Sequence, residues 1–290
     1  GVTATAILLT CLQLLKAKVD FHVPHRLDDG YGLNKDTLQR LATEQGVNLV
    51  VTVDCGIASL EEAEAAHQLG LELIITDHHE PKTTLPRASA MVHPRLPGAS
   101  YPFGGLSGAG VAFKLAWALC KRVSGSAKVE PHLREFLLDA VMLASLGTVA
   151  DVVPLFEENR IFVRHGIARL RTKPMLGLQH LLKCAKLDTK ANLGAVDIGY
   201  SLAPRINAAG RLGTARLAVE LLTTNSADRA LVLADFLERQ NKERQLIERR
   251  ILQEAREQAA QHLHAPALVL ASSEWHPGLL GVVASRLVDQ

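Results

Sequence analysis

The sequence predicts an α/β protein with a largely parallel sheet flanked by helices. Two short apolar runs, 49–53 and 71–76, are separated by one helical stretch, and each leads into acidic or imidazole side chains. Continuous runs of this length are typical of strands buried on both faces, and strand–helix–strand repetition favours parallel pairing. Farther along, residues 226–263 are predicted to form one long helix that leads into the start of a second α/β domain.

The first 100 residues are expected to alternate helices with strands. Asn34 is placed to cap one helix, and Ser59 and Glu62 have the spacing of a capping box for the next. The expected elements are a helix over 1–19, a strand over 19–24, a helix over 34–46, a strand over 49–53, a helix over 59–70, a strand over 71–76 and a short strand over 90–93.

The rest of the chain is expected to be mainly helical. A Gly/Pro-rich loop precedes helices over 111–123 and 132–146, and a Gly-Thr turn then leads to Asp151. The predicted organisation is a first domain over 1–225, with a sheet part to about 155 and a basic helical part over 156–225, a connecting helix over 226–263, and a truncated domain over 264–290 that opens with a strand over 267–271. The middle of the connecting helix is polar all round, which is typical of a helix that crosses solvent between two bodies.

Composition excludes several classes of protein. No apolar run approaches the roughly 20 residues of a membrane span. The four cysteines form no CxxC pair, so neither a structural zinc site nor a disulfide framework is indicated, and a reduced cytoplasm is the expected compartment. The net charge of +2 does not by itself indicate nucleic acid.

Acidic and imidazole side chains gather after the two central strands. Asp54 follows one strand, and Asp77, His78 and His79 follow the next. Because parallel strands end at the same edge of a sheet, these groups are expected to converge there, where open α/β sheets bind ligands. Asp151 is a further acid in an otherwise apolar segment. Carboxylates with imidazole suit Mg²⁺ or Mn²⁺, although two ions ask for more acids than these; the alternative is a set of solvated surface residues.

Positive charge is concentrated between residues 160 and 216. Seven Arg and four Lys stand against two Asp, so the segment carries about +9. Such a surface suits a polyanion such as nucleic acid, and the alternative is an ordinary solvated helical surface. Within it, Arg205 and Arg211 flank a small-residue turn that contains Asn207, a geometry that can place two guanidinium groups on phosphate oxygens.

Five blocks, in order, carry a resemblance to a known family: VTVDCG, IITDHH, ASLGTVADVVPL, APRINAAGRLG and EWHPGLLGVVASRL. Together they resemble the DHH phosphoesterase superfamily and, within it, the RecJ-like single-strand DNA exonucleases. The resemblance implies a metal-dependent 5′-to-3′ exonuclease on single-stranded DNA, acting in DNA repair and recombination. It also implies two Mn²⁺ or Mg²⁺ ions as cofactors, and single-strand-binding protein and repair helicases as partners.

The same resemblance implies roles for individual residues. Asp54 would be shared between two metals, and His78 and Asp151 would bind one of them. Asp77 would support the site from the strand end, and His79 would lie near the scissile phosphate. Arg26 and the block that contains Arg205, Asn207 and Arg211 would face the DNA phosphates.

The family's first motif, an Asp-x-Asp-Ala-Asp-Gly loop, is matched here only from its closing glycine, Gly1. We therefore expect a fragment of a longer enzyme with little or no nuclease activity by itself. Two other functions stay open from the residues alone: a phosphodiesterase for short oligonucleotides or cyclic dinucleotides, and a non-catalytic replication scaffold.

Overall fold

Three short parallel strands form the sheet of the described part of the chain. They are β1 (Leu49–Val53), β2 (Glu72–Thr76) and β3 (Ala90–Val92), in the order β1-β2-β3. Val53 pairs with Thr76, and Thr76 with Val92, so the last residues of all three strands meet at one edge. The computed structural model describes residues 1–24, 30, 32–126, 128–211, 214–260, 265 and 267–288, without the side chain of Arg211.

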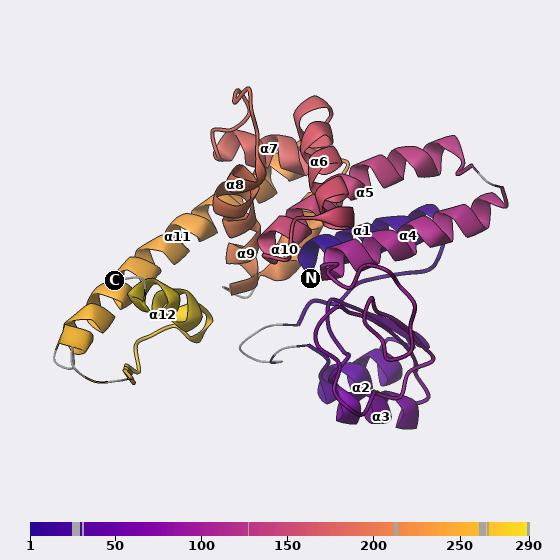
Figure 1. The fold of residues 1–290 in the computed structure, drawn as a ribbon, viewed down its shortest axis with the longest axis horizontal. Helices are drawn as coiled ribbons and strands as arrows, with labels where there is room; N and C mark the ends of the chain where they lie inside the picture. Colours follow the sequence, from indigo (N-terminus) through magenta and orange to yellow (C-terminus); the bar gives the residue numbers. More distant parts are fainter. Residues whose placement is uncertain are drawn as a thin grey trace.

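Two helices and the sheet enclose a small core. α2 (Lys35–Thr43) and α3 (Leu60–Gln68) lie together at the lower side of Figure 1. Their core residues are fully or nearly fully buried: Leu38, Ala63, Ala66, Leu71, Leu73 and Ile75. The Asn34 side chain accepts a hydrogen bond from the amide of Thr37, which confirms the predicted cap of α2. Ser59 precedes α3 but makes no side-chain cap bond, so the predicted capping box does not form.

A larger helical body lies beside the part of the chain that contains α2 and α3 (Figure 1), and Val51, Val53 and Val92 of the sheet pack against its core. Its core is a continuous cluster of buried aliphatic side chains that includes Ile7, Met142, Leu178 and Leu237. The helices are α1 (Val2–Leu14), α4 (Gly108–Ser124), α5 (Pro131–Ala150), α6 (Glu157–Thr172), α7 (Leu176–Cys184), α8 (Ala195–Asp197), the π-helix η1 (Ile198–Leu202), α9 (Ala203–Arg211) and α10 (Ala215–Thr223).

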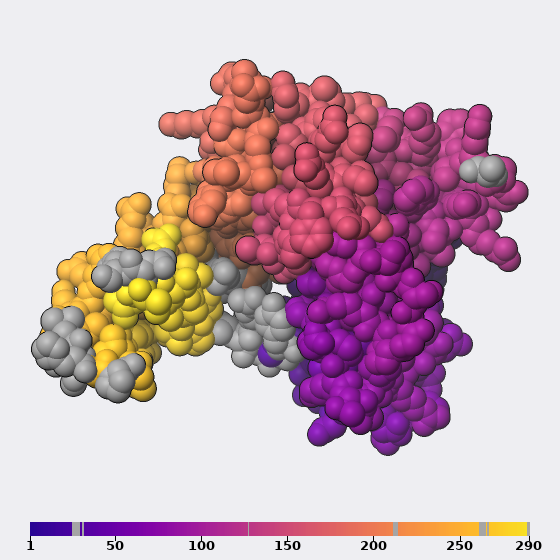
Figure 2. All heavy atoms as spheres, in the orientation of Figure 1, coloured from indigo at the N-terminus to yellow at the C-terminus, as the bar shows by residue number. Residues whose placement is uncertain are grey.

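The predicted long helix is confirmed as α11 (Ala227–Ala259), which has 33 residues. It leaves the helical body and carries a small third core at its far end, where Ile251 and Ala255 contact Trp275 and Val283. These partners belong to a 3₁₀ turn, η3 (Pro277–Leu279), its preceding loop and α12 (Leu280–Val288). In the space-filling view the C-terminal residues project to one side of the body (Figure 2). The division of the chain into domains stays a prediction.

Two predicted strands do not form. Residues 19–24 and 267–271 belong to no strand in the described structure. In the first segment the alternating pattern has another cause: Phe21 and Val23 pack on the helical body, and the guanidinium of Arg216 lies 4.5 Å above the Phe21 ring. In the second, Val269 is almost fully exposed. An isolated strand leaves its backbone groups without partners, so apolar alternation alone does not make one.

Two predicted turns are helical. Gly147 lies within α5, where an added Cβ would come within 2.4 Å of the Cβ of Ala109, so the glycine permits close packing of α4 on α5. Residues 205–211 lie within α9, because the small side chains that suggested a turn also pack well between helices. No helix in the described ranges is both long enough and apolar enough to cross a membrane.

Candidate metal centre

Asp54 and Asp77 lie side by side because each directly follows a strand at the same sheet edge. The amide of Asp54 donates to the Thr76 carbonyl at 2.9 Å, and the amide of Asp77 donates to the Val92 carbonyl at 3.2 Å. The ladder thus continues one residue past β1 and β2 and fixes the backbone of both acids. This is the convergence that the strand–helix–strand pattern predicted.

Asp54 adopts a backbone conformation that is rare for a residue with a side chain. Its φ is +64°. The start of α4 approaches so closely that a Cβ at Gly108 would lie 1.9 Å from Asp54 Oδ1. The carboxylate therefore sits at a helix N-terminus, where free amide groups and the helix dipole favour negative charge. Backbone strain held in this way is typical of functional sites.

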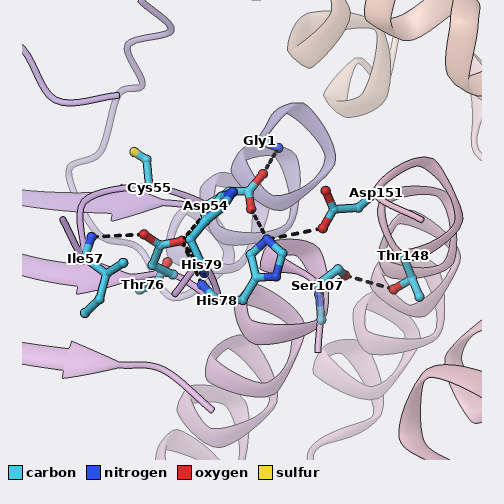
Figure 3. Close-up of polar contacts among 12 residues, drawn as sticks. Gly1, Asp54, Cys55, Ile57, Thr76, His78, His79, Ser107, Thr148 and Asp151 are labelled. Carbon is cyan, nitrogen blue, oxygen red and sulfur yellow. Dashed lines mark hydrogen bonds and ion pairs between the residues drawn. The ribbon is translucent and has the colours of Figure 1, made fainter. Parts of the chain in front are cut away.

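His78 joins the two acids that come from different parts of the chain. Its Nε2 lies 3.1 Å from Asp54 Oδ1 and 3.2 Å from Asp151 Oδ2, and the three side chains point toward one another (Figure 3). Asp151 directly follows the last residue of α5, 73 residues after His78 in the chain. The structure therefore brings together the three residues that were predicted to bind metal, while their role as ligands stays a prediction.

The donor set suits a divalent cation. Asp54 Oδ1 and His78 Nε2 are both buried, and neither has a hydrogen-bond partner despite their separation of only 3.1 Å. Asp54, His78 and His79 each offer a ligand atom, and these atoms lie within 4.8 Å of one another. Two buried lone pairs that face each other are unfavourable unless a proton or a cation lies between them. Carboxylate oxygen with imidazole nitrogen fits Mn²⁺ and, less strongly, Mg²⁺.

Both carboxylate oxygens of Asp77 accept hydrogen bonds from neighbouring groups of the protein. Its Oδ2 accepts a hydrogen bond from the amide of Ile57 at 2.9 Å, and its Oδ1 accepts from the amide of His78 at 2.7 Å and from His79 Nδ1 at 2.7 Å. With its oxygens occupied, Asp77 orients the two histidines. The bond from Nδ1 leaves Nε2 of the half-exposed His79 for a ligand or a substrate.

Four supporting residues were missed by the sequence reasoning. His93, at the end of β3, bonds the carbonyl of His79 through Nε2 at 2.8 Å, and Arg95 donates to the carbonyl of His78 at 2.7 Å. Ser107 caps α4, and its hydroxyl lies 3.0 Å from that of Thr148 in α5. His93 could have been predicted from its position, because it directly follows a third strand of the same sheet, as Asp54 and Asp77 follow the first two.

Burial and neighbouring charges shift the pKa of each member of the cluster in a different way. Burial alone would raise the pKa of Asp54, but the contacts with His78 and the amino group of Gly1 outweigh it and hold the pKa well below its usual range. Burial would lower the pKa of His78, yet Asp54 and Asp151 raise it. Burial, supported by repulsion from Asp54, raises the pKa of Asp151. Mutual repulsion among the acids is relieved by any cation at this position.

The structure does not bring the four predicted phosphate-binding residues together as it does the predicted metal ligands. Arg205 lies in α9 with a largely buried side chain, and its Nε donates to Glu238 Oε2 at 2.6 Å. Asn207 is exposed on the same helix. Arg26 and the side chain of Arg211 fall outside the described residues.

The +9 segment is also partly neutralised by acids, some of them elsewhere in the fold. At least five of its cations form ion pairs: Arg169, Lys173, Lys190, Arg205 and Arg216. The charge excess of the sequence is therefore larger than the free positive charge on the folded surface.

Comparison with known proteins agrees with this geometry. Residues 1–145 match the model of the DHH family, N-terminal domain. The whole chain aligns with the single-stranded-DNA-specific exonuclease RecJ of Bacillus subtilis at 44% identity, covering 35% of that protein, and with that of Dickeya dadantii at 40% identity, covering 52%. A crystal structure of exonuclease RecJ bound to manganese superposes with a TM-score of 0.86 at 38% identity, over all of this chain and 70% of that one. The chain thus spans about a third to a half of the curated relatives that it matches.

Proposed function

The chain belongs to the DHH family, and on this premise we propose that it supplies the catalytic core of a metal-dependent exonuclease. The proposed reaction is 5′-to-3′ hydrolysis of phosphodiester bonds in single-stranded DNA, in repair and recombination. One observation carries the proposal: buried Asp54 Oδ1 and His78 Nε2 face each other without a hydrogen-bond partner, beside Asp151.

The proposed cofactor is Mn²⁺ or Mg²⁺. The relative with a TM-score of 0.86 is described as bound to manganese, which supports the choice. Asp54, His78 and Asp151 would hold the ion. When bound, a divalent cation stabilises the negative charge that develops on phosphate oxygens during hydrolysis. A second ion would need acids in addition to these three.

The protein's own side chains would position the substrate. Asp77 accepts from His79 Nδ1 and so fixes the ring, whose Nε2 would contact the scissile phosphate and move a proton there. Arg26, Arg205, Asn207 and Arg211 would contact phosphates farther along the strand. For Arg205 this requires that phosphate compete with Glu238 for the guanidinium group.

We also propose the cellular setting. The substrate would be single-stranded DNA in the cytoplasm, and the partners would be a single-strand-binding protein and repair helicases. The names of the relatives, single-stranded-DNA-specific exonucleases, support the substrate. The partners rest on the family resemblance alone.

The test uses the protein with all of its natural flanking sequence. Single strands labelled at either end and the matching duplex are incubated with Mn²⁺, and products are resolved by length. We expect mononucleotides to be released from the 5′ end of the single strand only. Preference for dinucleotides or cyclic dinucleotides in competition would indicate a small-substrate phosphodiesterase, and failure to bind Mn²⁺ in a titration would indicate a scaffold.

A further inference from the structure

One buried amide group joins two segments that lead to different members of the metal centre. Asn159 lies in the first turn of α6 and is completely buried. Its Nδ2 donates to the carbonyl group of Gly105 at 2.7 Å and to the carbonyl group of Pro154 at 2.9 Å. Because both neighbours are acceptors, only the donor end of the amide can face them. The amide therefore fixes the two carbonyl groups relative to each other.

Each of these carbonyl groups belongs to a segment that reaches a proposed metal ligand. Gly105 lies three residues before Gly108, the first residue of α4, where an added Cβ would lie 1.9 Å from Asp54 Oδ1. Pro154 lies three residues after Asp151, in the connection from α5 to α6. The amide thus couples the segment that touches one carboxylate to the segment that carries the other.

A second buried hydrogen bond joins the start of α4 to the end of α5. The hydroxyl of Ser107, which caps α4, lies 3.0 Å from the hydroxyl of Thr148 (Figure 3). Both side chains are almost completely buried. Together with the two bonds of Asn159, this contact closes a ring that runs through the start of α4, the end of α5, the connection after Asp151 and the start of α6. It is called the Asn159 ring below.

The backbone beside the ring is held in conformations that are rare for residues with side chains. Asp54 has a φ of +64° and Val152 a φ of +56°, both in the left-handed region. Such strain persists only where the surrounding structure enforces it, and it concentrates at functional sites. Asn159 Oδ1 is itself buried and has no hydrogen-bond partner within the described ranges. A leucine would avoid the cost of burying this oxygen, but it would leave both carbonyl groups without their donor.

We propose that Asn159 is a positioning residue of the metal centre, because the ring that it closes sets the separation of Asp54 from Asp151 for a divalent cation. This inference rests on the proposed function. The two carboxylates lie 3.1 and 3.2 Å from His78 Nε2, and they come from segments that the ring holds together. Groups that orient metal ligands typically contribute roughly 10- to 100-fold to metal affinity. Asn159 therefore acts through the placement of the carboxylates and touches neither the ion nor the substrate.

The packing of the helices does not depend on this amide alone. The Tyr101 hydroxyl donates to Glu158 Oε1 at 2.8 Å, and Lys114 Nζ donates to Glu158 Oε2 at 2.9 Å. Phe113 of α4 and Phe162 of α6 pack edge to face, with ring centroids 5.1 Å apart. Loss of the amide is therefore expected to loosen the connection between α5 and α6 while α4 and α6 stay packed.

The experiment compares Asn159→Leu with Asn241→Leu in the protein with its natural flanking sequence. Asn241 is the matched control: it lies in α11, outside the ring, is 1% exposed, and its Oδ1 is likewise buried without a partner among the described residues. Mn²⁺ binding is titrated by the electron paramagnetic resonance signal of the free ion, at a temperature where circular dichroism shows every variant folded. Asn159→Leu is expected to weaken Mn²⁺ binding roughly 10- to 100-fold, and Asn241→Leu to keep the wild-type affinity. At saturating Mn²⁺, Asn159→Leu is expected to keep the wild-type KM for a single strand.

An Asp151→Ala background separates positioning from a general structural role. There, adding Asn159→Leu is expected to leave Mn²⁺ affinity unchanged, because the spacing of the two carboxylates no longer matters. Unchanged affinity in Asn159→Leu alone, an equal loss in both backgrounds, or the same loss from Asn241→Leu would each overturn the proposal. If Asn159→Leu does not fold, Thr148→Val breaks the ring at its other hydrogen bond and is judged by the same outcomes.

The wild type separates this inference from the proposed function. If the wild type binds no Mn²⁺, the proposed function fails and the inference fails with it. If the wild type binds Mn²⁺ and hydrolyses single strands while Asn159→Leu binds Mn²⁺ equally well, only the inference about Asn159 fails.

Discussion

The metal centre and the middle of α11 both bury charged side chains, but they balance that charge differently. At the sheet edge, Asp54 and Asp151 lie close to one another across His78. In α11, Glu248 is 1% exposed and is met by two cations: Arg244 Nη1 at 2.7 Å and Arg286 Nη2, from α12, at 2.8 Å.

Unpartnered atoms occur in both clusters, so their presence alone does not identify a ligand site. Asp54 Oδ1 and His78 Nε2 lack hydrogen bonds, and so do Arg244 Nε and Glu248 Oε1. In α11 one buried acid lies against two arginines, whereas at the sheet edge two acids, Asp54 and Asp151, share one imidazole. The comparison teaches that the sign of the surrounding charge separates a binding site from a structural network. It predicts that changes at the sheet edge mainly reduce activity and changes in α11 mainly reduce stability.

The largest effect is expected from Asp54→Ala. Removing this carboxylate should reduce nuclease turnover by far more than the roughly 10- to 100-fold typical of residues that only support a metal ligand. The melting temperature should fall by less than that of Glu248→Ala, because Asp54 lies at a strand end and its lost contact with His78 is partly offset by relief of the charge repulsion beside Asp151. Kinetic assays measure the loss of turnover, and thermal unfolding of the metal-free protein measures the change in melting temperature. Asp188→Ala, at an exposed acid, is the control; a variant that unfolds without losing activity would reverse the comparison.

Glu248→Ala should give the opposite pattern. It leaves Arg244 buried without its carboxylate partner, which typically costs about 3–5 kcal/mol in the free energy of unfolding. Chemical denaturation measures the loss, and turnover per folded molecule is expected to be unchanged. The matched variant Arg244→Met/Glu248→Leu removes both charges and should be much closer to the wild type. Equal losses in the single and double variants would show that the pairing of charges is not what holds α11 and α12 together.

Asp77→Asn tests a residue that lies in the metal centre but whose oxygens accept hydrogen bonds from the protein, as in a structural network. Its oxygens accept from three backbone amides and from the His79 ring, so an amide NH₂ in place of one oxygen must face a donor. We expect an intermediate result: a loss of about 1–3 kcal/mol in stability and of about 10- to 100-fold in turnover. Denaturation and kinetics on the same preparation give both values. Loss of activity with full stability would place Asp77 among the metal ligands instead.

The sequence predicted the centre of the fold better than its edges. β1, β2 and the helix between them form as expected because the strands are continuous apolar runs with clear ends, and α11 forms as expected although only its two ends have an apolar face. The strands predicted over 19–24 and 267–271 do not form, since pairing depends on a neighbouring strand that the local sequence does not reveal. Periodicity reports which side of a segment is buried, and an extended segment on a helical core has the same pattern as a strand.

The part of the site that could be predicted from the residues follows from the parallel order of the strands. Asp54 and Asp77 were expected to meet because parallel strands end together, and the structure places them so. The contact between His78 and Asp151 joins segments with no repeating connection, and it was expected from the family resemblance only. The bond between Arg205 and Glu238 was not anticipated, because a count of charges in one segment omits the acids that other elements bring to it.

The smallest effect is expected where charges are paired but exposed, at Glu135. Lys173 first, and then Arg169, lower the pKa of Glu135 from its ordinary 4.5 to about 2. A lowered pKa in the folded state stabilises the protein at pH values above 4.5, and this contribution is lost as the pH falls from 4.5 toward 2. Glu135→Gln should therefore lower the melting temperature slightly at pH 6, by an amount that shrinks below pH 4.5 and vanishes near pH 2. Exposed pairs contribute little in water, so the difference at pH 6 should be much smaller than that for Glu248→Gln. If the two substitutions lower the melting temperature equally, burial does not explain the contribution of the α11 network to stability. The contrast with the metal centre would then depend on the sign of the charges alone.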